Sequence, residues 1–211
     1  MHPGKGEIGV YLPGSGETAL LCDENSMLNE VQRQLACAWT ALEKGERNLI
    51  LPVHATRSID TLARQFRAQT RYIAGENGLW MHALVQENPL QFRLQFDGIR
   101  FALSFISLLC EKRLTLNHWR QQMPAACRSV QDIQVPACES GRLLHRIAES
   151  DKNAQLGGGV RLTRENGWAW LGLDERSAQL HIIAEAANME TSREICDFYG
   201  SEISRLLAVQ D

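Results

Sequence analysis

The sequence has no long apolar segment, no excess of basic residues and no closely spaced cysteine pair. No apolar run approaches the roughly 20 residues that a membrane-spanning helix needs. The net charge is −3, and no basic cluster indicates binding to nucleic acid or to an anionic membrane. The segment Met1–Gly6 has no apolar core and so differs from a signal peptide. We therefore expect a cytoplasmic protein that binds neither membranes nor nucleic acid.

The six cysteines include no Cys-x-x-Cys pair, and Cys22 and Cys110 lie in apolar runs. This pattern is typical of buried, reduced thiols rather than of a disulfide framework. The sequence also has no Ser/His/Asp signature, no P-loop and no Gly-x-Gly-x-x-Gly, and its histidines lack metal-ligand spacing. Its 211 residues, 44% of them hydrophobic, are enough for one large or two small globular domains.

Residues 1–125 alternate between strand and helix signals. Gly45 is expected to end one helix, Ser58 to cap a second and Asp97 to open a third. Alternating elements of this kind predict a three-layer α/β domain with a mixed, largely parallel sheet. The expected strands cover 8–12, 18–22, 48–53 and 70–73, and the expected helices cover 28–42, 58–66, 79–85, 97–110 and 116–123.

The pattern changes after Pro124, and residues 126–137 are expected to form a linker. Beyond the linker, residues 138–211 predict a small α+β domain with an antiparallel sheet and two helices. Asn166-Gly167 is a strong hairpin signal within it. The expected strands cover 159–163, 168–173 and 179–185, and the expected helices cover 140–148 and 191–207.

Three segments, in the same order, resemble the phosphoglucomutase/phosphomannomutase family, the α-D-phosphohexomutases. Gly167–Ala186 matches the last domain of that family without gaps, from its Gly-Trp strand to its Ala-Glu-Ala end. Ile8–Met27 resembles the opening of the family's third domain, and Asp97-Gly98-Ile99 resembles its Asp-Gly-Ile helix. The resemblance implies a C-terminal half, with the third domain at 1–125 and the fourth at 138–211. The family's two earlier domains, with the phosphoserine nucleophile, would precede Met1.

The family's metal loop supplies three carboxylates to Mg²⁺, which prefers several hard oxygen ligands. The matching positions here hold Pro13, Ser15 and Glu17, and the loop arginine is replaced by Thr18. Only one carboxylate remains, so we expect a plain turn and no bound Mg²⁺ or other cofactor.

The sugar-binding and phosphate-binding loops have also changed. In the sugar loop, matched to 86–90, Glu87 alone is kept, and we expect an exposed glutamate at a helix end. In the phosphate loop, the family's arginine becomes Gly172, and Asp174 and Glu175 add negative charge where a dianion would lie. Arg176 and His181 could still hold an anion, although a solvated arginine and a strand histidine also explain them.

These changes leave vestigial site positions, Glu17, Glu87, Arg176 and His181, but no catalytic or metal residues. The first hypothesis is a non-catalytic regulatory or oligomerisation module of a larger sugar-phosphate or nucleotide-sugar enzyme, such as a mannose-1-phosphate guanylyltransferase fusion. Its partners would be the preceding domains and a second copy of the chain, and phosphosugar binding would be weak or absent. The alternatives are the C-terminal half of an active phosphohexomutase, interconverting hexose 1- and 6-phosphates, or a small-molecule binder.

Overall fold

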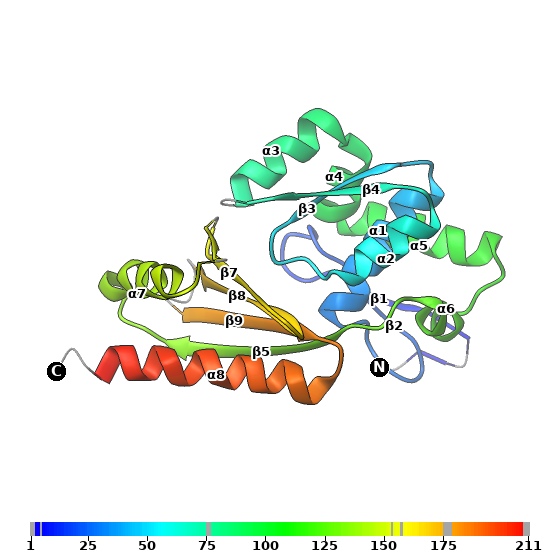
Figure 1. The fold of residues 1–211 in the computed structure, drawn as a ribbon. Coiled ribbons are helices and arrows are strands. Elements are labelled where there is room, and N and C mark those ends of the chain that lie inside the picture. The colour runs from blue at the N-terminus through cyan, green and yellow to red at the C-terminus, as the bar shows by residue number, and fades with distance from the viewer. Residues whose placement is uncertain are drawn as a thin grey trace. The chain divides into compact units, whose positions relative to one another are not determined.

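The structure is a computed structural model, and it describes residues 3–4, 6–74, 77–152, 154–156, 158–174 and 179–208. The chain divides into two compact units (Figure 1). The first comprises Met1–Leu51, Ala55–Tyr72 and Met81–Ala125, and the second comprises Pro52–His54, Ile73–Trp80 and Ala126–Asp211. Among the described residues, no helix combines the length and the apolar character that crossing a membrane requires.

The first unit is mainly helical. Its strands are β1 (Gly9–Tyr11), β2 (Leu20–Cys22), β3 (Asn48–Pro52) and β4 (Gln69–Ile73). Its helices are α1 (Glu30–Glu43), α2 (Ser58–Gln65), α4 (Pro89–Phe96), α5 (Gly98–Glu111) and α6 (Leu116–Gln122). The helix α3 (Asn77–Glu87) begins in residues grouped with the second unit and ends in the first.

The sheets of the first unit are smaller than the sequence predicts. β1 and β2 form an antiparallel pair, and β3 and β4 form a separate two-stranded sheet. Gln69 at the start of β4 donates its N–H to the carbonyl of Arg47, just before β3, so these two strands run in the same direction. The expected mixed, largely parallel sheet is therefore divided into two small sheets, and a helix absent from the prediction, α4, lies beside one of them.

Local signals set most helix ends in this unit. Asn29 and Gln32 form a capping box at the start of α1, and Asp97 caps α5 by accepting a hydrogen bond from the N–H of Arg100. The expected capping role of Ser58 is wrong. Ser58 is the first residue of α2, and its hydroxyl donates to the carbonyl of Ala125 at 2.8 Å.

A buried ion pair adds a polar contact to the helical core of this unit. Arg120 donates to Asp23 at 2.7 Å and to the carbonyl of Ser26 at 2.7 Å. Burial raises the pKa of Asp23. Hydrogen bonds from the N–H groups of Ser26 and Asn25 and from Arg120 lower it by more than burial raises it, so the net pKa lies below its ordinary value. The folded state of this unit therefore favours the ionised carboxylate.

The second unit is built on one antiparallel sheet with the order β5-β9-β8-β7-β6. Residues 126–137, expected as a linker, instead contain β5, which pairs along its full length with β9. The two prolines near this stretch lie outside the strand, so neither prevents pairing. The strands are β5 (Cys127–Gln134), β6 (Gln155–Leu156), β7 (Val160–Arg164), β8 (Gly167–Asp174) and β9 (Gln179–Ala186), and the helices are α7 (Ala137–Ser150) and α8 (Met189–Ala208).

Both helices pack on one face of this sheet. Leu143 and Ile147 of α7 and Tyr199 and Ile203 of α8 share a buried apolar cluster with alternate residues of β7, β8 and β9. Residues at even positions of β8, Trp168, Trp170 and Gly172, belong to the opposite face because side chains alternate along a strand. The candidate site in this unit lies on that second face.

Candidate functional site

The loop between β1 and β2 is the stretch that the sequence resemblance matches to the family's metal loop. A turn closes it, in which the N–H of Gly16 donates to the carbonyl of Pro13 at 3.1 Å. Gly16 also accepts from the N–H of Gly98 at 3.0 Å, which holds the start of α5 against the loop. Glu17 is exposed, and the described residues contain no group of three His, Cys, Asp or Glu placed to hold a metal. The residues present do not fit Mg²⁺, because a single exposed carboxylate cannot replace its oxygen ligands.

The stretch matched to the sugar loop is helical. Glu87 is the last residue of α3, and it pairs with Arg71 while both side chains stay about half exposed. Asn88 caps α4 by accepting a hydrogen bond from the N–H of Gln91 at 2.9 Å, and Pro89 occupies the first helical position. The expectation of an exposed glutamate at a helix end is thus confirmed. In this chain the stretch contains the end of α3 and the start of α4, with Asn88 between them.

The helix α4 also occupies the free side of β3. The side-chain amide of Gln91 accepts from the N–H of Ile50 at 3.0 Å and donates to the carbonyl of Ile50 at 2.8 Å. The amide of Asn88 donates to the carbonyl of Asn48 at 3.0 Å. Backbone groups that a further strand would bond are therefore bonded by side chains from α4. A polar cavity of about 250 Å³ lies nearby, but it combines Arg71 with two carboxylates, those of Glu46 and Glu87.

In the second unit, two buried arginines lie on the face of the sheet opposite the helices. Arg128 of β5 forms a 3.0 Å ion pair with Glu185 of β9, and both side chains are buried. Arg161 of β7 is also buried, and its guanidinium lies 3.9 Å from the ring centre of Trp168. The arginines donate to consecutive carbonyls of the Pro52–His54 segment: Arg161 to Val53 at 2.7 Å and Arg128 to His54 at 3.2 Å. Both guanidinium groups are therefore held by protein groups.

The indole of Trp170 covers Gly172, the residue that the sequence resemblance matches to the family's phosphate-binding arginine. A Cβ atom built on Gly172 would lie 2.0 Å from the indole ring of Trp170, and a Cβ atom on Gly159 would lie 2.8 Å from its nitrogen. The indole therefore lies over Gly172 of its own strand and over Gly159, the residue before β7, and only a residue without a side chain fits beneath it. The ring of His54 contacts the same indole, with ring centres 4.9 Å apart.

The remaining predicted residues have different outcomes. His181 in β9 is half-buried and hydrogen-bonds Asp132 of the neighbouring strand β5, so its ring has a protein partner. Arg176 lies outside the described residues, as does Glu175. Glu17 and Glu87 belong to the first unit and His181 to the second. Sequence reasoning missed Arg128, because the segment Cys127–Gln134 around it alternates only weakly between apolar and polar residues.

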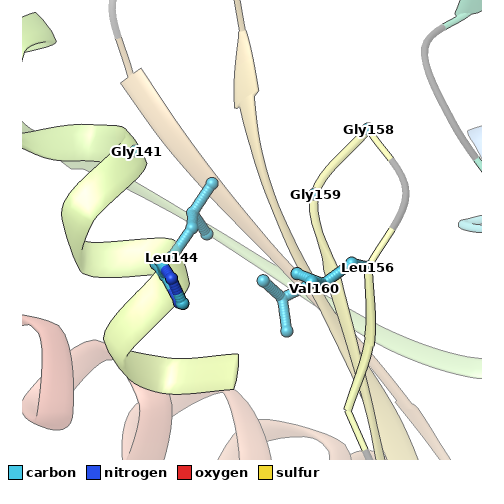
Figure 2. Close-up of a pocket in the computed structure, with 7 residues that line it drawn as sticks. Gly141, Leu144, Leu156, Gly158, Gly159 and Val160 are labelled. Carbon is cyan, nitrogen blue, oxygen red and sulfur yellow. The ribbon is translucent and has the colours of Figure 1, made fainter. Parts of the chain in front are cut away.

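An apolar cavity of about 310 Å³ lies between α7 and the strands β6 and β7. Figure 2 shows Leu144 of α7 facing Leu156 and Val160 across it. Among the described residues that line it, His145 is the one with a titratable side chain, and it is mostly exposed. A lining of this type offers no charged donors for a phosphate dianion.

Comparison of the sequence with protein-family models and with curated proteins finds no match. Solved structures do match. A phosphoglucomutase/phosphomannomutase family protein from Burkholderia thailandensis covers 92% of this chain with 16% identity and a TM-score of 0.68. The phosphoglucomutase pp63/parafusin from Paramecium covers 94% with 14% identity and a TM-score of 0.64. A phosphomannomutase from Thermus thermophilus, described as putative, covers 95% with 14% identity and a TM-score of 0.63.

The chain has the phosphohexomutase fold. It spans about half the length of the structures that it matches, 46%, 45% and 46% of the three chains above. At such low identity the likeness concerns the fold and not the activity. Whether the loops of this chain can bind a metal ion or a phosphosugar must therefore be judged from its own residues.

Proposed function

We propose that this chain is a non-catalytic, phosphohexomutase-derived module, and that it acts as a regulatory or oligomerisation part of a larger sugar-phosphate or nucleotide-sugar enzyme. In this proposal the first unit corresponds to the family's third domain and the second unit to its fourth. A fusion to a sugar nucleotidyltransferase of the mannose-1-phosphate guanylyltransferase type is one form that such an enzyme could take.

The observation that carries the proposal is the packing of Trp170 on Gly172. Phosphoryl transfer depends on groups that position the phosphate and stabilise its charge. An arginine at position 172 could not leave the strand without displacing the indole, because even a Cβ atom there would overlap it. The position from which the family's guanidinium would reach a phosphate is thus closed by an apolar ring.

The chemistry of the other positions agrees with this proposal. The buried guanidinium groups nearest to the site bond Glu185 and the carbonyls of Val53 and His54. A phosphate would have to compete with these bonds. Each charge-assisted hydrogen bond that is lost costs about 1.5–3 kcal/mol. The exposed Glu17 adds no compensating cation.

Isothermal titration calorimetry tests the loss of ligand binding. Glucose 1-phosphate and mannose 1-phosphate are titrated into the 211-residue chain, with and without Mg²⁺, and an active phosphohexomutase is the positive control. We expect dissociation constants weaker than about 1 mM, which corresponds to less than about 4 kcal/mol of binding free energy. Micromolar binding that disappears in Arg176→Ala would contradict the proposal, because it would mean that a new cradle exists.

A turnover assay tests the loss of catalysis separately. The purified chain is incubated with each hexose 1-phosphate and a bisphosphate activator, and formation of the 6-phosphate is followed. We expect no turnover above the background of a mock purification. Turnover that co-purifies with the chain and falls in Arg176→Ala or Glu87→Gln would support the alternative, an active phosphohexomutase half.

A further inference from the structure

The helix α5 of the first unit is apolar on two of its sides (Figure 1). One side packs into the core through buried residues such as Phe101 and Phe105. The other side carries a second apolar row, at positions spaced by four, three and four residues. This spacing places the row on one stripe of the helix and is typical of the seam between two paired helices. We call this row the α5 stripe; its members are Ile99, Leu103, Ile106 and Cys110.

The α5 stripe lies largely in solvent. Leu103 is 65% exposed and Ile99 is 55% exposed. Cys110 is also exposed, and Ile106 is partly buried. Single apolar residues at a surface are ordinary, but this row continues over about three turns of one helix. A continuous apolar row of this kind marks a surface for interaction.

A second row borders the stripe and shows what covers it. It repeats the same spacing of four, three and four residues, so it follows the stripe along its whole length. The row consists of Arg100, Ser104, Ser107 and Glu111, with opposite charges at its ends and small serines at its centre. Arg100 and Glu111 are exposed, and within the described part of the chain neither side chain makes a hydrogen bond or an ion pair. Both charges are therefore available to another molecule.

We propose that α5 packs antiparallel against α5 of a second copy of this chain, about a two-fold axis midway between Leu103 and Ile106. In this arrangement Leu103 of each copy contacts Ile106 of the other, and Ile99 lies opposite Cys110. The serines of the bordering row lie near the axis, where their small side chains let the two helices approach. A self-complementary contact of this type is isologous and closes a dimer.

The charges of the bordering row select a second copy and its direction. In the antiparallel pair, Arg100 of each copy lies beside Glu111 of the other, so two pairs of opposite charge form. A parallel pair would place arginine beside arginine and glutamate beside glutamate, which is unfavourable. The helix dipoles favour the same direction, because the N-terminus of each helix lies beside the C-terminus of the other. The surface therefore complements itself, and a second copy is the partner that it fits.

The contact is short. A helix of 14 residues is about 21 Å long, so the pair buries less surface than a standard interface of about 1,600 Å². We therefore expect a micromolar rather than a nanomolar dimer. Salt should weaken it further, because the charge pairs lie at the exposed border of the contact.

This inference deepens the oligomerisation part of the proposed function, but the two can fail separately. A monomer without mutase activity would overturn the dimer and leave the loss of catalysis standing. A dimer that binds phosphosugar in the micromolar range would do the reverse. The calorimetric and turnover measurements above therefore do not decide the state of α5.

Sedimentation equilibrium of the 211-residue chain over about 1–500 µM is the first test. We expect a monomer–dimer equilibrium that weakens at least about tenfold in Leu103→Lys. The matched control is Leu156→Lys on β6 in the second unit, because Leu156 is the same residue type with the same exposed fraction, 65%. This control should leave the equilibrium unchanged. A chain that stays monomeric at 500 µM, or a dimer that Leu103→Lys weakens no more than the control does, overturns the proposal.

Exchange of the two charges tests the direction of the helices. Arg100→Glu and Glu111→Arg should each weaken the dimer by about threefold or more, because each variant turns two attractive pairs into pairs of like charge. The double variant Arg100→Glu/Glu111→Arg restores both attractive pairs, so its dissociation constant should return to within about twofold of the native value. A parallel pair offers no such restoration. A double variant that dimerises no more tightly than the single variants contradicts the antiparallel arrangement.

Cross-linking of Ile99→Cys with a short bismaleimide locates the axis. In the proposed dimer the new thiol lies opposite Cys110 of the other copy, whereas the two Cys110 residues are about 16 Å apart along the helix. Peptide mass spectrometry of the covalent dimer should therefore find links between positions 99 and 110. These links should disappear in Ile99→Cys/Cys110→Ser. Links mainly between the two Cys110 residues would indicate a parallel pair and overturn the proposal.

Discussion

Replacing Gln91 with alanine should destabilise the first unit far more than its place in a short helix indicates. The side chain is almost fully buried, at 4% exposure, and it bonds both the N–H and the carbonyl of Ile50. Alanine favours a helix, so helix propensity alone predicts a small gain in stability. The decisive effect is that the buried N–H and carbonyl groups of Ile50 lose the two hydrogen bonds that Gln91 makes to them.

The magnitude follows from the cost of each unpaired group. A buried donor or acceptor left without a partner costs about 1–3 kcal/mol, and water that enters the gap recovers part of it. We therefore expect Gln91→Ala to lower the free energy of unfolding by about 2–4 kcal/mol. At about 4 °C per kcal/mol, the melting temperature of this unit should fall by roughly 8–16 °C. The control is Gln86→Ala, because Gln86 is exposed on α3 and should change stability by less than about 0.5 kcal/mol.

Two measurements check this account. Urea unfolding followed by circular dichroism gives the change in stability, and native-state hydrogen exchange of the Ile50 amide gives its local cause. Gln91→Glu is informative because it keeps an acceptor for that amide but removes the donor to the carbonyl, so its loss in stability should include the burial of a charge. The reasoning is refuted if Gln91→Ala resembles the Gln86 control, or if exchange at Ile50 is unaltered.

Three further predictions concern other parts of the chain. Asp23→Asn should cost about 3 kcal/mol at pH 7, while Glu24→Gln should cost little. The folded pKa of Asp23 is lowered, so its stabilising effect is fully present above its unfolded pKa of about 3.8. This effect is lost as the pH falls through the lower folded pKa. The urea midpoints of Asp23→Asn and of the native chain should therefore converge in acid. Gly172→Ala should destabilise the second unit by about 1–3 kcal/mol in thermal melts, because its Cβ would overlap the indole of Trp170. The loss should be smaller in a chain that also carries Trp170→Leu. Equal losses with Trp170 and with Leu at position 170 would show that the indole is not the obstacle. Burial raises the pKa of the Cys37 thiol to about 12, so at pH 8 iodoacetamide should label the exposed cysteines within minutes and Cys37 only in denaturant, as peptide mass spectrometry can show.

The sequence predicts best the elements that carry their own end signals. The hairpin signalled by Asn166-Gly167 joins β7 and β8 as expected, with Glu165 and Asn166 as its two turn residues and Gly167 as the first residue of β8. Asp97 caps α5, and the helix continues to Glu111, close to the expected end. Such signals act within a few residues, so they can be recognised without the rest of the fold.

Other elements depend on partners distant in the sequence. The apolar alternation of β5 is weak and favours a linker, and its pairing with β9, about fifty residues later, makes it a strand. The helix α4 is absent from the prediction although Asn88-Pro89 is a helix-start signal, because this stretch is matched to a loop of the family. The predicted sheet is divided where α4 lies beside β3 and Gln91 bonds the backbone of Ile50. No sequence pattern indicates that a glutamine side chain will take the place of a strand there.

The candidate site divides in the same way. That positions 13, 15 and 17 hold one carboxylate and that position 172 holds no arginine can be read from residue types alone, and these types do not suit a magnesium ion or a dianion. The packing over position 172 is different. It depends on Trp170 and Gly172 standing two residues apart on one face of β8, and on Gly159 lying beside them. Alternation along the strand predicts the shared face, but the direction of the indole ring comes only from the packed structure.

The packing of Trp170 also limits which substitutions this face of the sheet can accept. An arginine introduced at position 172 meets the indole at once. A smaller residue introduced first at position 170 opens a void over Gly172 and Gly159. Either order passes through a less stable intermediate, so a cationic site at position 172 needs two coordinated substitutions. A new ligand site would arise more readily elsewhere in the chain.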